Sequence, residues 1–156
     1  MAKEDLERSF PRLGESGYRI TSPADARYNC AAWAVGEADR WWDPALEGGY
    51  YWPAGVPRLL SLLHLIAAFG TRGYEPSAHA GLEKDFEKVA IYADEHSWPT
   101  HVARQLPSGA WTSKMGVSED IEHATLEALE GPLYGRAVQF LRKRRAQASN
   151  SGTKPS

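Results

Sequence analysis

The sequence contains a single cysteine, Cys30, among its 156 residues. One cysteine excludes a disulfide within the chain, and a chain without disulfides fits a cytoplasmic location. The first ten residues are charged where a secretory signal needs an apolar segment, so we expect no signal peptide. Any chemistry at Cys30 would therefore be that of a free thiol.

Long apolar runs and an excess of one charge are also missing. The longest apolar stretch, residues 59–70, is interrupted by Ser61 and His64 and is too short to span a bilayer. The formal net charge of −2 gives no attraction to nucleic acid or to anionic membranes. The sequence has no HExxH motif, no cysteine pair for a metal and no phosphate-binding glycine loop. We therefore expect no cofactor or metal, and neither nucleic acid nor a membrane as a partner.

Aromatic residues, in contrast, are abundant, with six Trp and seven Tyr. Residues 41–57 hold five of them together with three Pro and three Gly, which predicts a loop. These aromatic side chains either pack over the core as a lid or line a substrate groove.

The order of the predicted elements indicates an α+β fold. The chain begins with a polar arm, residues 1–20, which is either poorly ordered or wrapped around the domain, and a single domain follows over residues 21–143. We expect a helix start at 22–25, helices over 30–40, 57–70 and 117–130, strands over 88–93, 100–106, 110–115 and 137–141, and a disordered tail over 144–156. Because helices come first and hairpin-linked strands follow, we expect N-terminal helices packed on a small antiparallel sheet.

Cys30 is the first candidate for chemistry. It follows Asn29, a preferred helix-capping residue, and so would lie in the first turn of a helix. The positive end of the helix dipole favours the thiolate, which is the reactive form. The alternative is that Cys30 is a small buried hydrophobic residue.

A cysteine nucleophile needs a base, and His101 is the best placed of five histidines because it begins a predicted strand. If the turn at 107–109 pairs Leu106 with Ala110, His101 and Ser113 lie diagonally on one face of the hairpin. A slip of one residue would bring Lys114 to that face instead. The candidates for the group that orients His101 are Ser113, Gln105, Asp120 and Lys114.

Two further histidines have simpler interpretations. His64 lies within an apolar helix and is expected to be structural. Asp120 and His123 are three residues apart on the helix predicted for 117–130, where a solvated acidic face is favoured over a metal site.

A cysteine at a helix start, followed by a strand and then a histidine-bearing strand, resembles the papain-like fold of NlpC-type and CHAP-type cysteine peptidases and amidases. The residues that carry this likeness are Asn29-Cys30, the strand at 88–92 and Thr100-His101-Val102-Ala103. The resemblance implies Cys30 as nucleophile and His101 as base. Ser113 or Lys114 stands where that group usually has His, Asn, Asp or Gln.

The stretch from Tyr28 to about Leu141 more specifically resembles an uncharacterised bacterial domain family. The motifs that carry this likeness are YNCAAWA, RWWDP, FEKVAIYA, PTHVARQL, WTSKMG and DIEHATL. The resulting hypothesis is a cysteine hydrolase or transferase that acts on an amide, ester or isopeptide bond of a peptide or small molecule. The alternative is a non-catalytic module of the same fold that binds a peptide or ligand. The candidate catalytic residues are Cys30, His101 and Ser113, and the candidate substrate-binding residues are Asn29, Trp33, Trp41, Trp42, Tyr51, Trp52 and Gln105.

Overall fold

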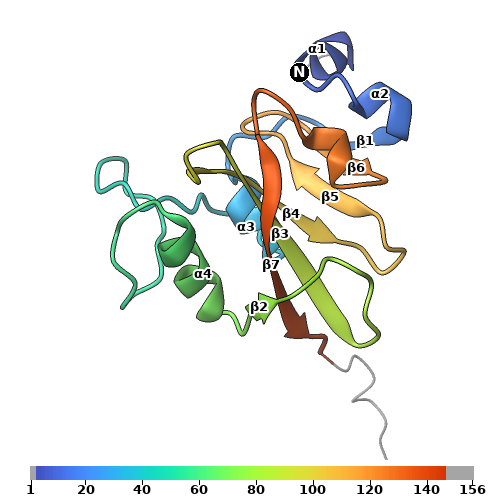
Figure 1. Ribbon diagram of the computed structural model, residues 1–156. Helices are drawn as coiled ribbons and strands as arrows, with labels where there is room; N and C mark the ends of the chain where they lie inside the picture. The colour runs from blue at the N-terminus through green and yellow to red at the C-terminus, as the bar shows by residue number, and fades with distance from the viewer. Residues whose placement is uncertain (1–2, 147–156) are drawn as a thin grey trace, which may run out of the picture.

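The protein has an α+β fold built on one antiparallel sheet, as the sequence predicts (Figure 1). The computed structural model describes residues 3–146, so nearly all of the tail predicted over 144–156 lies outside the described residues. Within that range seven strands pair in the order β1-β6-β5-β4-β3-β7-β2, with every neighbouring pair antiparallel. The strands are β1 (Tyr18–Ser22), β2 (Glu75–Ser77), β3 (Phe86–Ala93), β4 (Pro99–Gln105), β5 (Trp111–Lys114), β6 (Asp120–His123) and β7 (Arg136–Arg144).

The helices are short and lie around the sheet. They are α1 (Lys3–Ser9), α2 (Leu13–Ser16), α3 (Cys30–Ala34), α4 (Leu62–Gly70) and the single 3₁₀ turn η1 (Glu127–Leu129). Figure 1 shows α4 on the side of the sheet that carries the long loop, and α1 and α2 at the opposite, upper end of the view. Among the helices of residues 3–146, none combines the length and the apolar character that a membrane span requires.

The side chains of strand β3 divide between two clusters of the core. Successive side chains of a strand point to opposite faces of the sheet, and all four residues from Val89 to Tyr92 are fully buried. Val89 and Ile91 join the cluster that contains the buried residues of α3 and α4. Ala90 and Tyr92 join the cluster that contains those of α1 and α2. Both faces of the sheet are therefore covered, each by a different pair of helices.

Residues 3–20 form a folded segment that packs against the rest of the domain. Leu6, Phe10 and Leu13 are at most 2% exposed and belong to the second cluster. The strand β1 then pairs with β6, so the sheet crosses the domain start predicted at residue 21. Three apolar side chains in an otherwise polar segment are enough to attach it, because each removes a large apolar surface from water.

The helix predicted over residues 117–130 is wrong. Residues 120–123 form β6, which pairs with β5 on one side and β1 on the other, and only η1 is helical beyond it. In a strand the sequence Asp-Ile-Glu-His alternates between the two faces, so Ile121 and His123 share one face. His123 is therefore fully buried instead of lying on a solvated helix face.

Two other predicted helices are shorter in the structure. α3 ends at Ala34 and not near Arg40, and Gly36 with a φ of 85° turns the chain there. α4 begins at Leu62, because Ser61 caps it by accepting a hydrogen bond from the His64 backbone. The helix start predicted at 22–25 is absent, since residue 22 ends β1.

Candidate functional site

Cys30 begins α3, and Asn29 fixes that start. The Asn29 side-chain oxygen accepts hydrogen bonds from the backbone N–H of Ala32 at 3.2 Å and of Trp42 at 3.1 Å. Its amide nitrogen donates to the Trp42 carbonyl oxygen at 2.7 Å. Asn29 therefore caps the helix and attaches the aromatic loop to it. Its side-chain oxygen and nitrogen, which the sequence interpretation assigns to substrate binding, are engaged in these hydrogen bonds.

The Cys30 thiol lies against the edge of β4. The ladder between β4 and β5 pairs Arg104 with Thr112 and Gln105 with Trp111, and it extends no further toward the start of β4. Beyond that point the backbone N–H of Val102 hydrogen-bonds the Cys30 sulfur. The Cys30 sulfur thus takes the position in which a further residue of β5 would pair with Val102, the residue that follows His101.

The His101 imidazole is held by hydrogen bonds that run through side chains of β5 and β6. Its Nε2 lies 2.9 Å from Ser113 Oγ, and Ser113 Oγ lies 2.8 Å from His123 Nε2. His123 Nδ1 in turn lies 2.9 Å from the Thr125 carbonyl oxygen. All three side chains are at most 2% exposed. The hairpin register predicted from the turn is confirmed, since Leu106 pairs with Ala110, and so is the diagonal contact between His101 and Ser113.

Two aromatic rings complete the surroundings of His101. The Tyr134 ring stacks on the imidazole with centroids 4.3 Å apart and planes 5° apart, and the Tyr92 ring lies at 5.4 Å. Burial, together with the charge of His123, lowers the pKa of His101 well below its usual 6.5. Burial also lowers the pKa of His123, to about 4. Both imidazoles are therefore neutral at pH 7.

The thiol is neutral as well, which corrects the expectation of a thiolate. Cys30 is half-buried as a residue, but desolvation of its thiol raises the pKa, and hydrogen bonds from the backbone N–H groups of Val102 and Ala31 only partly oppose this. α3 has five residues, so its dipole is small. The low pKa of His101 and the raised pKa of Cys30 thus favour two neutral groups and not the thiolate that the helix position predicts.

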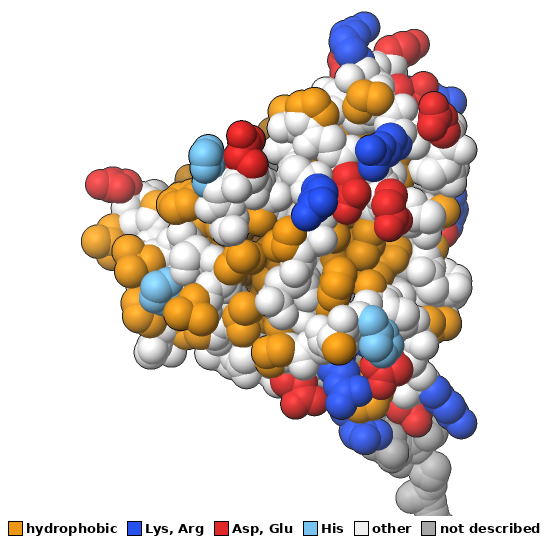
Figure 2. Space-filling view, viewed as in Figure 1, with side chains coloured by type: hydrophobic (Ala, Val, Ile, Leu, Met, Phe, Trp, Pro, Cys, Tyr) orange, Lys and Arg blue, Asp and Glu red, His pale blue; other side chains and the backbone are white. Residues whose placement is uncertain are grey.

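Cys30 and His101 line the same pocket, which has a volume of about 150 Å³. Its other walls come from the aromatic loop, the start of α4 and the start of β4. These lining residues are Asn29, Ala31, Trp42, Asp43, Pro44, Trp52, Leu60, Leu65, Pro99, Thr100 and Val102. Figure 2 shows hydrophobic side chains gathered over the lobe that α4 and this loop form. The pocket is therefore mostly apolar, with a thiol and an imidazole in its wall.

The structure brings only some of the predicted binding residues to this pocket. Trp42 and Trp52 line it, as does Asn29, whereas Trp33, Trp41, Tyr51 and Gln105 do not.

The four that lie elsewhere have other partners. The indole N–H of Trp33 donates to Thr112 Oγ1 at 2.9 Å. Trp41 packs against a tyrosine of the same loop, and the guanidinium of Arg40 lies over the ring of Tyr51. The Gln105 amide donates to a backbone carbonyl and lines a different cleft. These side chains stabilise the loop and the sheet.

Of the four candidates for orienting His101, Ser113 makes the contact. Asp120 accepts a hydrogen bond from the Tyr28 hydroxyl at 2.6 Å. The Lys114 ammonium donates to the Ser118 carbonyl and is fully buried. Together with the position of Gln105, these contacts exclude the other three from the imidazole.

His123 is the member of the site that the sequence interpretation missed. A helix over 117–130 places it on a solvated face, whereas β6 places it behind Ser113. With Ile121 as its single apolar residue, the stretch from Asp120 to His123 gives only a weak alternation signal for a strand. Among residues 3–146, no three His, Cys, Asp or Glu side chains gather in an arrangement that could hold a metal ion.

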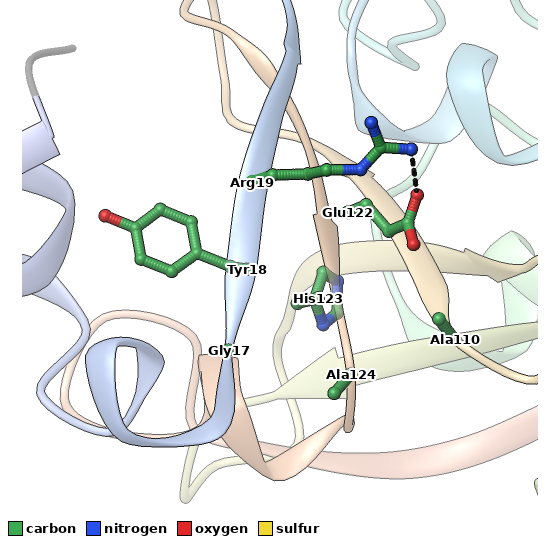
Figure 3. Close-up of a pocket in the computed structure, with 7 residues that line it drawn as sticks. All are labelled: Gly17, Tyr18, Arg19, Ala110, Glu122, His123 and Ala124. Carbon is green, nitrogen blue, oxygen red and sulfur yellow. Dashed lines mark hydrogen bonds and ion pairs between the residues drawn. The ribbon is translucent and has the colours of Figure 1, made fainter.

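A second cleft, of about 300 Å³, lies on the other side of His123 (Figure 3). Arg19 crosses it to form an ion pair with Glu122 at 3.0 Å, while Tyr18 points away from that pair. His123 forms part of its lining although the ring is fully buried. Neither Cys30 nor His101 lines this cleft, so it is separate from the pocket at Cys30.

The fold and site together define an α+β domain with a thiol and an imidazole in one apolar pocket. The family described as "Domain of unknown function (DUF7689)" matches residues 19–142, and the chain belongs to this family. No curated protein and no solved structure matches the chain.

Proposed function

We propose that the protein is a cysteine hydrolase or transferase of papain-like type, acting on the carbonyl group of an amide, ester or isopeptide bond. The observation that carries the proposal is the shared pocket, with the Cys30 thiol and the His101 imidazole in its wall. The hydrogen bond between His101 Nε2 and Ser113 Oγ keeps the imidazole in one orientation. Nucleophile, base and orienting group are the three parts that covalent catalysis by a thiol requires.

Because both partners rest in their neutral forms, His101 acts as a general base during attack. As the Cys30 sulfur bonds to the substrate carbonyl carbon, its proton moves to His101 Nδ1. The imidazolium then gives this proton to the departing nitrogen or oxygen, and a thioester to Cys30 remains. Water or another acceptor attacks the thioester and returns its proton through His101, which releases the product and restores the thiol.

The pocket supports a substrate with a small apolar group next to the reacting carbonyl. A volume of about 150 Å³ leaves room for a small group. Trp42 and Trp52 provide flat apolar walls, and Asp43 is the acidic side chain among the lining residues. A bulky or strongly anionic group would be excluded by size and by charge.

Labelling by an activity-based thiol probe tests this proposal. The wild type is treated at pH 7 with a small peptide-like electrophile, beside Cys30→Ala, His101→Ala and the control His64→Ala. His64 is a suitable control, because it also hydrogen-bonds a serine but lies on α4. We expect the wild type to be labelled at Cys30. The labelling rate should fall by about 100-fold or more in His101→Ala and should stay at the wild-type value in His64→Ala. Equal labelling rates in the His101 variant and the wild type would refute catalysis by this pair.

One observation favours a second function, that of a ligand-binding module. Burial opposes ionisation of both Cys30 and His101, so the resting pair lacks the thiolate that many cysteine enzymes use. In that case the pocket would bind a small apolar ligand without turnover. Cys30 would then react only after unfolding, and Cys30→Ser would keep full ligand affinity.

A further inference from the structure

The protons along the chain of contacts behind His101 can be assigned, starting from the Thr125 carbonyl. A carbonyl oxygen only accepts hydrogen bonds, so the Nδ1 of His123, 2.9 Å away, carries a proton. A neutral imidazole has one N–H, so the Nε2 of His123 carries none and accepts. The group that faces it at 2.8 Å is the Ser113 hydroxyl, which must donate its single proton there.

The same logic continues to His101. The Ser113 hydroxyl has used its proton on His123, so at 2.9 Å its oxygen accepts from His101 Nε2, which must carry the N–H. The Nδ1 of neutral His101 is then left with its lone pair. We infer that His123 and the Thr125 carbonyl are positioning groups that fix the tautomer of His101, so that Nδ1 is the basic nitrogen. This inference rests on the proposed function, in which that nitrogen receives the proton of Cys30.

The alternative tautomer is disfavoured because it takes away the donor that faces His123 Nε2, the Ser113 hydroxyl. If His101 carried its proton on Nδ1, its Nε2 would accept from Ser113, and the Nε2 of His123 would lose its donor. Leaving a buried acceptor without a donor shifts the equilibrium between the two His101 tautomers by roughly tenfold or more, toward the form protonated at Nε2. Because His123 is fully buried, water does not readily replace the lost donor.

The residues of the cleft in Figure 3 do not alter the hydrogen bonds of the His123 ring. The ring of His123 lies on the far side of β6 from the Arg19–Glu122 ion pair, which occupies those two side chains. β1 pairs with β6 directly at this position, with Tyr18 opposite His123. The Thr125 carbonyl is accordingly the group that decides where the His123 proton resides.

Nitrogen-15 NMR of the wild-type imidazoles tests the inference without any substrate. Long-range ¹H–¹⁵N correlation spectra at pH 7 distinguish a protonated ring nitrogen from an unprotonated one. We expect His101 protonated at Nε2 and His123 protonated at Nδ1. A His101 ring protonated at Nδ1 would overturn the inference, whatever the thiol does.

Variants of His123 provide the functional arm. His123→Leu removes the acceptor for Ser113, so we expect His101 to shift toward the Nδ1-protonated form and Cys30 labelling to slow by about 10- to 100-fold. His123→Gln keeps an amide oxygen for Ser113 and should recover most of the rate. His64→Leu removes a serine–histidine contact that lies away from this chain of hydrogen bonds and serves as the matched control. Thermal unfolding confirms that each variant is folded.

The outcomes separate the two proposals. If the NMR tautomers are as assigned but labelling is independent of His101, the proposed function fails and the positioning role is not catalytic. If labelling depends on His101 but both His123 variants match the wild type in rate and tautomer, the positioning role fails and the proposed function stands.

Discussion

Acidification from pH 7 to pH 5 is expected to destabilise the folded protein through its two buried histidines. Burial lowers the pKa of both His101 and His123 in the folded state, so the unfolded chain binds protons that the folded chain does not. Stability is therefore fully present above about pH 6.5 and is lost as the pH falls toward the folded-state pKa values.

The size of the effect follows from the pKa of His123. With about 6.5 in the unfolded chain and about 4 in the folded one, His123 alone removes about 2 kcal/mol at pH 5 and about 3 kcal/mol at pH 4. His101 acts in the same direction. For a domain whose total stability is of the order of 5–15 kcal/mol, this is a large fraction.

Urea unfolding at pH 7, 6 and 5 measures the effect, because carboxylates contribute mainly below this range. Glu37 is an example of such a carboxylate. Burial tends to raise its pKa, but hydrogen bonds from Arg40, Trp42 and Arg72 lower it to about 2. The stability that Glu37 contributes is therefore lost only below about pH 4.5. His123→Gln should reduce the loss between pH 7 and 5 by about 2 kcal/mol. A wild-type free energy of unfolding that is the same at pH 7 and pH 5 would refute the assignment of two neutral buried imidazoles.

Three further outcomes are expected. Alkylation of Cys30 by iodoacetamide should rise with pH to an inflection above about 8.5, because burial raises the thiol pKa, and an inflection below that value would contradict the neutral pair. Glu37→Ala should cost about 1–3 kcal/mol in urea unfolding, since the buried Trp42 indole N–H then loses the acceptor that lies 2.9 Å away; an unchanged midpoint would contradict this. Gly135→Ala places a Cβ 2.0 Å from a backbone oxygen of β3, whereas Gly36→Ala has a similarly positive φ but open space. The first should therefore lower the free energy of unfolding by at least about 2 kcal/mol more than the second, and equal losses would count against the clash.

The central hairpin could be predicted because its determinants are local. The turn at 107–109 sets which residues pair, and strand alternation then places Ser113 diagonally from His101. The capping of α3 by Asn29 is likewise a property of neighbouring residues. Such features need no knowledge of distant parts of the chain.

The strand β6 and the N-terminal segment could not be predicted in this way. The apolar spacing of Ile121, Ala124 and Leu129 fits a helix as well as a loop that follows a strand. What decides for a strand is pairing with β5 and with β1, and the hydrogen bond of Arg19 to Glu122 spans 103 positions of the chain. That pairing also converts His123 from a surface residue into a buried partner of Ser113.

The sequence by itself determined the α+β class, the order of Cys30 before His101, and the hairpin register that joins His101 to Ser113. Only the tertiary structure decided the protonation of the site. Burial under the sheet and the loop makes the thiol and both imidazoles neutral, and the Thr125 carbonyl orders the protons behind His101. Local spacing selects which side chains can meet, but desolvation and hydrogen-bond direction depend on every element packed around them.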